Sequence, residues 1–366
     1  VFLLMGTGVV HNQLSYIQNR NLGYSKDHIF VLPLDQKLND KIDLVKSELR
    51  QNPNIQGLSK AYESPVRING GYGVSKSNLP SSPSWTVTAN PVDDEYLKVC
   101  NMELLAGENI NRTDIENAET TDSTKFRFAF ILNETCARML GWTPQQAIGQ
   151  MLFLGNDRPG FVKGVVRDFH FQSMHTAIGP LMMMPGGWGN TLLVKTGGGN
   201  PENTVDFLKE KWAKLAPYRP FETRFLDDEF QQLYESEKRT ATVFNLFSGI
   251  AIVLACMGLF GLSAYSARQR MKEIGIRKVL GASVWQITVL LSRSFLLLVL
   301  VASLVALPVA WWMMDKWLQD FAYRTDLQIW MFAGSTLMLG VLTLLTVGIQ
   351  ATKAAVGNPV RALRMD

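Results

Sequence analysis

The sequence predicts an α-helical transmembrane bundle joined by a long stalk helix to a large α+β domain outside the cytoplasm. Three observations predict this class. Charge-free apolar segments lie in the last third of the chain, a mixed polar sequence fills the first two-thirds, and basic residues gather in particular loops. The formal net charge of +4 hides this arrangement, because it averages over both parts of the 366-residue chain.

Three segments are long and apolar enough to cross a bilayer. No charged residue occurs between Arg239 and Arg268, between Arg293 and Asp315, or between Asp326 and Lys353. Each segment exceeds the ~20 residues that a helix needs to cross ~30 Å of hydrocarbon. We therefore predict three transmembrane helices, within residues 228–267, 294–314 and 327–352.

The charges of the connecting loops predict the orientation. Residues 268–293 carry six basic residues against the single acid Glu273, whereas residues 315–326 carry more acidic than basic residues. By the positive-inside rule, residues 268–293 and the tail 353–366 are cytoplasmic and the loop 315–326 is outside. The large domain, residues 11–227, must then also lie outside the cytoplasm.

The first ten residues, VFLLMGTGVV, are apolar but too few to cross a bilayer. They also lack the charged n-region with which a signal peptide begins. We therefore expect residues 1–10 to be the end of a truncated transmembrane helix that begins upstream.

A stalk is predicted where the outer domain meets the first span. No Pro or Gly occurs between Asp228 and Gly249, so nothing in the sequence interrupts a helix there. One helix from Asp228 to Ala267 would be ~55–60 Å long at 1.5 Å per residue, which exceeds the membrane by several turns. Residues 228–267 are therefore expected to form both the stalk and the first span.

Residues 11–227 are predicted to form an α+β domain of two subdomains, because short β-rich runs alternate irregularly with amphipathic helices. The predicted strands are residues 28–34, 126–132, 160–166, 190–196 and 222–228. Three helices are expected, each beginning at a capping residue: Asn39 to Pro53, Asn133 to Gly141, and Asn200 to Pro217. The Gly-, Ser- and Pro-rich residues 65–91 are expected to be a long exposed loop or a ragged edge.

Small residues mark one face of the first predicted span. They are Ala251, Ala255, Gly258 and Gly261. In lipid such a face lets another helix approach closely, although small residues scattered over a lipid-facing helix are the alternative. In the second span, Pro308 is expected to produce a kink, and Trp311 and Trp312 suit an outer aromatic belt.

The cytoplasmic loop reads ARQRMKEIGIRKVLGAS and mixes apolar with basic residues. One interpretation is an interfacial helix whose lysines and arginines reach into lipid headgroups. The other is a docking helix for a cytoplasmic partner. The chemistry of the residues favours neither interpretation over the other.

The same loop closely resembles the R-x-K-E-I-G-I-R-K-x-L-G-A signature of FtsX-like permeases of the MacB type. The matching residues are Arg270, Lys272, Glu273, Ile274, Gly275, Ile276, Arg277, Lys278, Leu280, Gly281 and Ala282. The tail resembles the family's C-terminal pattern at Asn358, Pro359, Val360, Leu363 and Arg364. Residues 91–110, 130–141 and 164–175 also look like this family, in the variety common in Bacteroidetes, so the resemblance covers nearly the whole chain.

The resemblance implies a permease subunit of an ABC transporter, with a MacB-like periplasmic core domain, in the cell (inner) membrane. The matching loop residues would receive the movement of a cytoplasmic ABC ATPase subunit and pass it to the outer domain, a process called mechanotransmission. Export or efflux of a drug, peptide or lipoprotein is the implied function. A second permease unit, in the same polypeptide or a homodimer, and a periplasmic adaptor are the further implied partners, besides the lipid bilayer. The alternative is an FtsX-like membrane regulator of a cell-wall hydrolase that transports nothing.

Catalysis and cofactors are not expected in this chain. GGGNPENT has glycines but lacks the Gly-Lys-Ser/Thr of a phosphate-binding loop, so ATP hydrolysis is expected in a separate subunit. Asp168, His170 and His175 are poorly spaced for a metal site, and no G-x-S-x-G elbow indicates a hydrolase. The acidic residues 93–95 are expected to be a solvated helix start.

Neither the three cysteines nor the basic loop indicates a further functional site. Among three cysteines only Cys100 and Cys136 could pair, because Cys256 lies in a predicted span, and three unpaired thiols are the favoured interpretation. The basic loop lacks the aromatic interleaving of a nucleic-acid-binding surface, so no nucleic-acid partner is expected.

Overall fold

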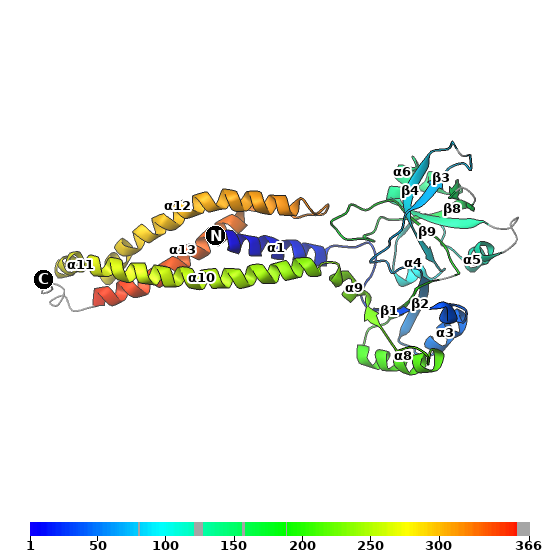
Figure 1. Ribbon diagram of the computed structural model, residues 1–366, viewed down its shortest axis with the longest axis horizontal. Coiled ribbons are helices and arrows are strands. Elements are labelled where there is room, and N and C mark those ends of the chain that lie inside the picture. The colour runs from blue at the N-terminus through cyan, green and yellow to red at the C-terminus, as the bar shows by residue number, and fades with distance from the viewer. Residues whose placement is uncertain (80, 121–126, 156–157, 188, 357–366) are drawn as a thin grey trace. The chain divides into compact units, whose positions relative to one another are not determined.

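The structure, a computed structural model, describes residues 1–79, 81–120, 127–155, 158–187 and 189–356. The chain divides into two compact units, which Figure 1 shows. The helical unit comprises Val1–Asn19 and the chain from Glu235 onward, and the α+β unit comprises Arg20–Tyr234. The α+β unit thus begins and ends later than the predicted domain of residues 11–227.

The α+β unit contains a four-stranded antiparallel sheet in the order β11-β1-β10-β2. Its strands are β1 (Ile29–Pro33), β2 (Ile55–Ala61), β10 (Thr191–Thr196) and β11 (Arg224–Phe225). The helices α3 (Ile42–Leu49) and α8 (Pro201–Leu215) follow β1 and β10. This chain order, β1-α3-β2 followed by β10-α8-β11, is a split β-α-β arrangement, and the rest of the unit is inserted between β2 and β10.

The inserted strands close into a ring. The sheet continues in the order β2-β4-β3-β7-β8-β6-β9, and β9 pairs back onto β4. The ring strands are β3 (Tyr72–Ser75), β4 (Ser84–Val92), β6 (Phe128–Asn133), β7 (Met151–Leu154), β8 (Arg158–Val166) and β9 (Leu181–Pro185), and β5 (Leu104–Gly107) pairs with β8. A single residue pair, Ala61 with Val92, joins β2 to β4.

Each of these two parts encloses its own hydrophobic core. In the four-stranded part, Phe30 and Val194 of the sheet pack with Val45 of α3 and with Leu208 and Trp212 of α8. The ring encloses a second set of buried residues, which includes Val87, Phe130, Leu152, Val162 and Met182.

The predicted strands are confirmed except the last, and one predicted loop is wrong. Residues 65–91 are not a long loop or ragged edge, because β3 and β4 form a hairpin there and β4 lies inside the sheet. The strand expected at residues 222–228 is reduced to Arg224–Phe225, since the chain turns into α9 (Leu226–Gln232). The three acidic residues in the first turn of α9, Asp227, Asp228 and Glu229, suit the positive end of a helix better than a strand.

Two of the three predicted helix starts are confirmed. Asn133 caps α6 (Glu134–Met139), and Asn200 caps α8 through a hydrogen bond from Glu202 N at 3.0 Å. The prediction that Asn39 caps a helix is wrong, because Asn39 is the last residue of α2 (Gln36–Asn39). Its buried side-chain amide instead forms hydrogen bonds with the backbone N and O of Gly189. The remaining short helices are α4 (Tyr96–Val99), α5 (Arg112–Glu119) and α7 (Pro144–Ala147).

The acidic residues 93–95 precede a helix as predicted, since Glu95 is the N-cap of α4, but Asp93 is not solvated. Asp93 is 3 % exposed and accepts hydrogen bonds from Ser59 Oγ at 2.7 Å and from Lys60 N at 2.6 Å. Its carboxylate also pairs with Lys46 at 2.6 Å, and Glu95 accepts from Leu58 N at 3.3 Å. The two carboxylates therefore satisfy backbone donors along the edge of β2, where a neighbouring strand is missing.

The helical unit consists, in its described residues, of α1 (Phe2–Asn19), α10 (Glu235–Gln269), α11 (Met271–Val279), α12 (Val284–Leu318) and α13 (Ile329–Val356). Figure 1 shows α1, α10, α12 and α13 running alongside one another. Three described helices are long and apolar enough to cross a membrane: Glu235–Gln269, Val284–Leu318 and Ile329–Lys353. The first helix continues nine residues beyond the predicted end at Val10.

The predicted helix from Asp228 to Ala267 is not continuous. It is interrupted at Leu233 and Tyr234, whose amides donate to the carbonyls three residues earlier, at Phe230 and Gln231. The Tyr234 side chain is buried, and its hydroxyl accepts a hydrogen bond from Met174 N at 2.9 Å. This tertiary contact holds Tyr234 in the α+β unit, and no Pro or Gly signals it in the sequence. The long helix α10 begins directly afterwards, at Glu235.

Candidate functional site

The predicted cytoplasmic loop 268–293 is mostly helical. Arg270 departs from helical geometry after α10, and α11 then runs from Met271 to Val279. The second long helix starts at Val284, ten residues before the predicted start of the second span at residue 294. The segment is therefore a short helix held between two long ones.

Two tight hydrogen-bonded turns position α11. Gly281 adopts φ +91°, a conformation that only glycine takes readily. Ala282 N donates to Arg277 O at 2.9 Å and Gly281 N donates to Lys278 O at 3.1 Å, which is the Schellman pattern of a helix end. Ser283 then caps α12 in a capping box with Gln286. The Gly281-Ala282 pair of the motif thus ends one helix so that the next can start two residues later.

One face of α11 packs into the helical unit. Ile274 is 5 % exposed, and Gly275 is buried. Ile274 clusters with Ile287 and Leu291 of α12 and with Ala351 of α13, and Ala282 packs against the same group. These motif residues therefore fix α11 to both neighbouring spans.

The opposite face of α11 is exposed and mixes apolar with charged groups. Ile276 is 53 % exposed and Leu280 is 81 % exposed. Lys272, Glu273 and Arg277 are also exposed, and Glu273 pairs with Arg277 at 2.8 Å. Sequence reasoning missed Trp285, which is 74 % exposed in the first turn of α12. The Ser283-x-x-Gln286 capping signature predicts a helix that begins at Val284, so it could have placed Trp285 in the first turn of that helix.

The small residues of α10 do not pack within the described chain. Ala251, Ala255, Gly258 and Gly261 are all exposed, and no described atom lies within 4 Å of a Cβ built at either glycine. The residues of α10 that are buried are Ser248, Ser263 and Ala267. The small-residue face is therefore open to a helix from elsewhere or to lipid.

Packing inside the helical unit uses a different contact of α10. A Cβ built at Gly6 of α1 would lie 2.6 Å from Phe244 Cε1, so α1 and α10 approach closely at this glycine. Thr7 Oγ1 and Ser248 Oγ are hydrogen-bonded at 3.2 Å beside it. The end of α1 is held by Gln13, a fully buried side chain whose Nε2 donates to Tyr323 O and whose Oε1 accepts from Thr325 N, both at 2.9 Å.

The histidines of the α+β unit do not form a metal centre. Among the described residues, no group of three or more His, Cys, Asp or Glu is placed to hold a metal ion. Asp168 instead accepts from Thr135 N and Oγ1 at the start of α6. Burial, together with the charge of Arg20, lowers the pKa of His170 to about 4. His175 stacks on Tyr234 with ring centroids 6.5 Å apart.

The described cysteines are free thiols. Cys100 and Cys136 are both buried, Cys256 is partly buried, and none forms a disulfide. Burial raises the pKa of Cys136 to about 12 and raises that of Cys100 as well, so neither thiol is a ready nucleophile.

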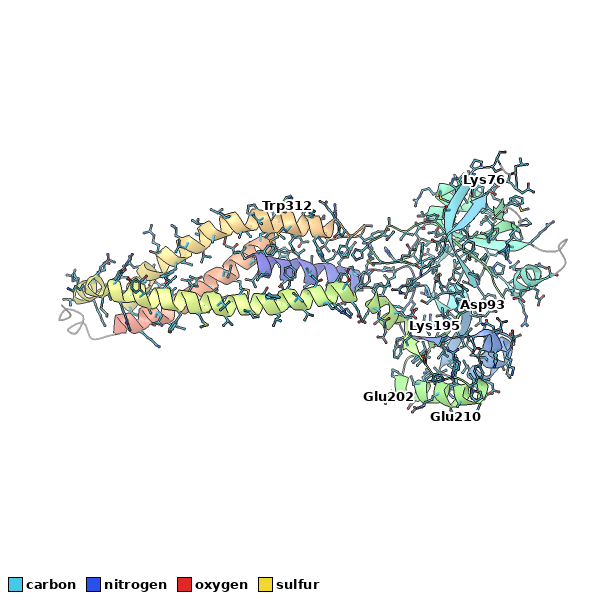
Figure 2. The ribbon with its side chains drawn as sticks, in the orientation of Figure 1. Lys76, Asp93, Lys195, Glu202, Glu210 and Trp312 are labelled. Carbon is cyan, nitrogen blue, oxygen red and sulfur yellow. The ribbon has the colours of Figure 1, made fainter. Side chains whose placement is uncertain are left out.

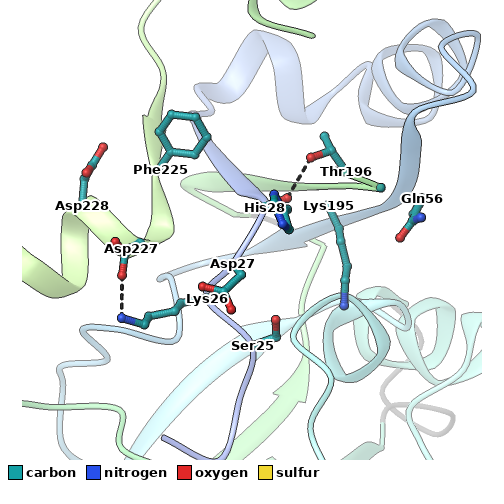
Figure 3. Close-up of a pocket in the computed structure, with 11 residues that line it drawn as sticks. Ser25, Lys26, Asp27, His28, Gln56, Lys195, Thr196, Phe225, Asp227 and Asp228 are labelled. Atoms are coloured by element: carbon teal, nitrogen blue, oxygen red, sulfur yellow. Dashed lines mark hydrogen bonds and ion pairs between the residues drawn. The ribbon is translucent and has the colours of Figure 1, made fainter. Parts of the chain in front are cut away.

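A polar pocket of about 630 Å³ lies in the α+β unit (Figure 3). Lys26 and Asp227 form an ion pair at 2.5 Å on its wall, and Thr196 Oγ1 donates to the His28 carbonyl at 3.1 Å. Ser25 and His28 both line the pocket, but the described contacts include no hydrogen bond between their side chains.

The tail residues that resemble the family pattern, Asn358, Pro359, Val360, Leu363 and Arg364, lie outside the described residues. Of the two motifs, the structure therefore describes only the one at residues 270–282, which forms α11 and its two turns.

Comparison with known proteins finds similarity in sequence to permeases. Residues 245–359 match the model of the FtsX-like permease C-terminal domain. The ABC transporter permease YknZ of Bacillus subtilis (strain 168) is 22 % identical over 351 residues, which cover 87 % of this chain and 83 % of that protein.

Two solved structures of outer domains are also similar. The periplasmic region of MacB from Actinobacillus actinomycetemcomitans aligns with a TM-score of 0.40 at 15 % identity, over 59 % of this chain and 97 % of that one. The extracellular domain of YknZ from Gram-positive bacteria aligns with a TM-score of 0.35 at 13 % identity, over 53 % of this chain and 97 % of that one.

Proposed function

From the premise that this chain carries an FtsX-like permease domain and is homologous to an ABC transporter permease, we propose that it is a non-catalytic permease subunit. A separate cytoplasmic ABC ATPase binds and hydrolyses ATP. The permease receives the resulting movement at α11 and transmits it to the α+β unit outside the cytoplasm, for export or efflux of a drug, peptide or lipoprotein.

The arrangement of α11 carries this proposal. A docking element must be rigidly attached to the spans that it moves, and it must present an accessible surface to its partner. Ile274 and Gly275 supply the attachment, since they are buried against α12 and α13. Ile276, Leu280 and Trp285 supply an exposed apolar surface beside the charges of the motif. Apolar anchors with charged neighbours are typical of a specific protein interface.

The orientation and membrane follow from the charge distribution. The positive-inside rule places α11 in the cytoplasm and the α+β unit on the other side of the cell (inner) membrane. The chain is then a multi-pass protein in which α10 and α1 both connect the membrane to the α+β unit.

A second permease unit is proposed to pack on the small-residue face of α10. Ala251, Ala255, Gly258 and Gly261 leave the backbone open to close approach, which suits a helix–helix contact in lipid. A symmetric dimer would use this face on both copies.

The docking surface can be tested by photocrosslinking in native membranes. A photoreactive amino acid at the exposed position Ile276 should capture an ATPase subunit with a Walker motif. The same group at the buried position Ile274 is the matched control and should capture no ATPase, because that side chain faces α12 and α13. Labelling of lipid alone from Ile276 would make α11 an interfacial helix and would overturn the proposal.

The transmission step can be tested by charge reversal. Replacing Arg277 and Lys278 with Glu should abolish the stimulation of ATP hydrolysis by the permease while the α+β unit stays folded. Lys353→Glu, at the end of α13, is the control for net charge and should leave the stimulation in place. Unchanged stimulation in the Arg277 and Lys278 variant would contradict a role of α11 in docking.

A further inference from the structure

The junction between α9 and α10 lacks most of the sequence signals that separate two helices. No glycine follows α9, and Leu233, its C-cap, has right-handed helical dihedral angles of φ −61° and ψ −23°. Tyr234 directly precedes α10, although Ser, Thr, Asp and Asn are the residues that usually cap a helix start. Glu235 and Glu237 in the first turn of α10 are the exception, since acidic residues suit a helix start. The local sequence therefore gives little reason for the helix to stop here.

The backbone hydrogen bonds at the break differ little from those of a continuous helix. Leu233 N donates to Phe230 O and Tyr234 N donates to Gln231 O, both at 3.2 Å. In an α-helix the same two amides would donate to the carbonyls one residue earlier, at Glu229 and Phe230. A tight turn of this kind within a helical stretch often marks a hinge. The broken and the continuous forms therefore differ in only a few backbone hydrogen bonds.

Side-chain contacts hold α9 in the α+β unit. Glu229 accepts a hydrogen bond from Ser64 Oγ at 2.6 Å and pairs with Arg224 at 2.9 Å. Lys26 Nζ lies 4.6 Å from the centroid of the Phe230 ring, and Phe230 is itself 2 % exposed. These contacts come from three different segments of the unit. They fix the axis from which any continuation of α9 would have to start.

Tyr234 is the last residue held in this way. Its side chain is 2 % exposed, and its hydroxyl accepts the hydrogen bond from Met174 N at 2.9 Å. Its ring packs edge-to-face on Phe230 with centroids 5.3 Å apart. The next two residues, Glu235 and Ser236, are exposed. The hold of the α+β unit on this stretch therefore ends at the tight turn.

The tight turn and the Tyr234 contact depend on each other. A 3₁₀ turn advances about 120° per residue, whereas an α-helix advances about 100°. With α9 held in place, relaxing residues 233 and 234 into an α-helix rotates Tyr234 by roughly 40° about the helix axis. The hydroxyl lies at the far end of a long side chain, so it would move by more than the few tenths of an ångström that a hydrogen bond tolerates. A continuous helix and the bond from Met174 N to Tyr234 therefore exclude each other.

We propose that this junction is a two-state switch in the connection between the α+β unit and α10. While the Tyr234 hydroxyl accepts the Met174 amide, the tight turn separates α9 from α10 and leaves a hinge between them. When that hydrogen bond breaks, α9 and α10 become one rigid helix. The switch is a property of the junction and does not depend on the ATPase of the proposed function.

Hydrogen exchange of the full chain in nanodiscs tests the switch with Tyr234→Phe. This variant keeps the buried ring and removes the acceptor of the Met174 amide, which should then exchange several-fold faster. In a continuous helix the Glu235 and Ser236 amides gain acceptors four residues earlier, so they should exchange several-fold slower. Loss of a purely structural contact would speed exchange at Glu235 and Ser236 or leave it unchanged, and either result would overturn the proposal.

Tyr218→Phe is the matched control for the loss of a tyrosine hydroxyl. Tyr218 donates to Asp35 Oδ1 at 3.0 Å in the same unit, but its side chain is 48 % exposed. The control should change the exchange of neither Met174 nor Glu235. Circular dichroism checks that both variants are folded. A Met174 amide that is unaffected by Tyr234→Phe would show that the hydroxyl does not hold it, and it would also overturn the proposal.

A metal clamp drives the switch in the other direction. Gln232 and Ser236 are both exposed and lie four residues apart across the break. Histidines at i and i+4 face the same side of a continuous helix and can bind one Zn²⁺ ion together. In the double variant Gln232→His and Ser236→His, Zn²⁺ should therefore favour the continuous form. The Met174 amide should then exchange several-fold faster when Zn²⁺ is added.

Glu235→His with Arg239→His is the control pair for the clamp. Both positions lie within α10, where the native side chains already meet at 3.0 Å, so Zn²⁺ should bind and leave the Met174 amide unchanged. Titration calorimetry measures Zn²⁺ binding to each pair. The proposal is wrong if the pair across the break binds Zn²⁺ without any change at Met174. It is equally wrong if only the control pair binds, because no continuous form would then be within reach.

Discussion

The α+β unit and the helical unit differ in what covers their apolar side chains. In the α+β unit the large side chains Phe30, Phe130 and Trp212 are at most 2 % exposed, because strands and helices of the same chain cover them. On α10, Leu254 and Met257 remain 61 % and 67 % exposed. The first unit completes its own core in water, whereas the second leaves most of its apolar surface to be covered by lipid or by a partner helix.

The two units also differ in how they use buried polar groups. In the α+β unit, Asp93 and Lys46 form a charged pair that is supported by Ser59 and by the backbone of Lys60 (Asp93 is labelled in Figure 2). In the helical unit, the neutral amide of Gln13 makes the buried contacts to Tyr323 and Thr325. A charge is the more costly group to leave unpaired, so the two units should respond differently to the loss of one side chain.

The largest effect is expected from Asp93→Ala. Removal of one partner from a buried ion pair typically costs about 3–5 kcal/mol, since it leaves the charge of Lys46 uncompensated. Thermal unfolding of the full chain in detergent, followed by tryptophan fluorescence, measures the loss. Asp43→Ala is the control, because its side chain is 79 % exposed in a surface pair with Arg112, and it should cost less than about 1 kcal/mol. Equal losses in the two variants would contradict the buried network.

A smaller effect is expected from Gln13→Leu in the helical unit. The apolar side chain leaves Thr325 N and Tyr323 O without their partner, at a total cost of about 1–3 kcal/mol because both groups are only partly buried. Hydrogen exchange in nanodiscs should show faster exchange of the Thr325 amide. Gln18→Leu, at an exposed position of the same helix, should not change that rate. If the Thr325 amide exchanges as fast in the unsubstituted chain as in the Gln13→Leu variant, the hydrogen bonds of Gln13 do not hold this loop against α1.

A still smaller effect is expected at the turn that positions α11. Gly281→Ala places a Cβ in the left-handed region at φ +91° and should cost about 1–2 kcal/mol. The Ala282 amide, which donates to Arg277 O, should therefore exchange faster. Gly249→Ala is helical and meets no described atom within 4 Å, so it should leave this amide unchanged and strengthen α10 slightly. An unaffected Ala282 amide in Gly281→Ala would show that the turn tolerates side chains.

The smallest effect is a pH dependence that only the α+β unit should show. The pKa of His170 is lowered from 6.5 to about 4 by burial, so the unfolded chain takes up its proton at a higher pH than the folded chain does. Stability should therefore fall as pH drops from 6.5 towards 4, by an amount on the order of 1 kcal/mol at pH 6. His170→Gln should flatten this slope in thermal unfolding. An unchanged slope in His170→Gln would assign the dependence to other groups.

The membrane helices were predictable from the sequence because their signal is local. A run without charge that is longer than ~20 residues has few alternatives to a membrane span. The helix caps at Asn133 and Asn200 were also predictable, since a cap bonds the backbone two or three residues away. The boundaries were less accurate, as the early start of α12 at Val284 shows, because charged residues such as Arg293 continue a helix without interrupting it.

The missed features depend on residues far apart in the chain. The acidic run at residues 93–95 has the composition of a solvated surface, and only its neighbours in β2 and α3 make Asp93 a buried link. The break at Tyr234 depends in the same way on Met174, sixty residues away. The closure of the ring depends on the pairing of β4 with β9, which no local pattern encodes.

The sequence by itself determined the three long apolar helices, the charge asymmetry of the loops between them and the motif that resembles FtsX-like permeases, because hydropathy, charge and motif are properties of contiguous residues. Only the tertiary structure decided which face of that motif is available. Ile274 and Ile276 are two residues apart and chemically identical, yet one is 5 % and the other 53 % exposed. Helical geometry turns them to different sides, and the packing of α12 and α13 covers only one of those sides.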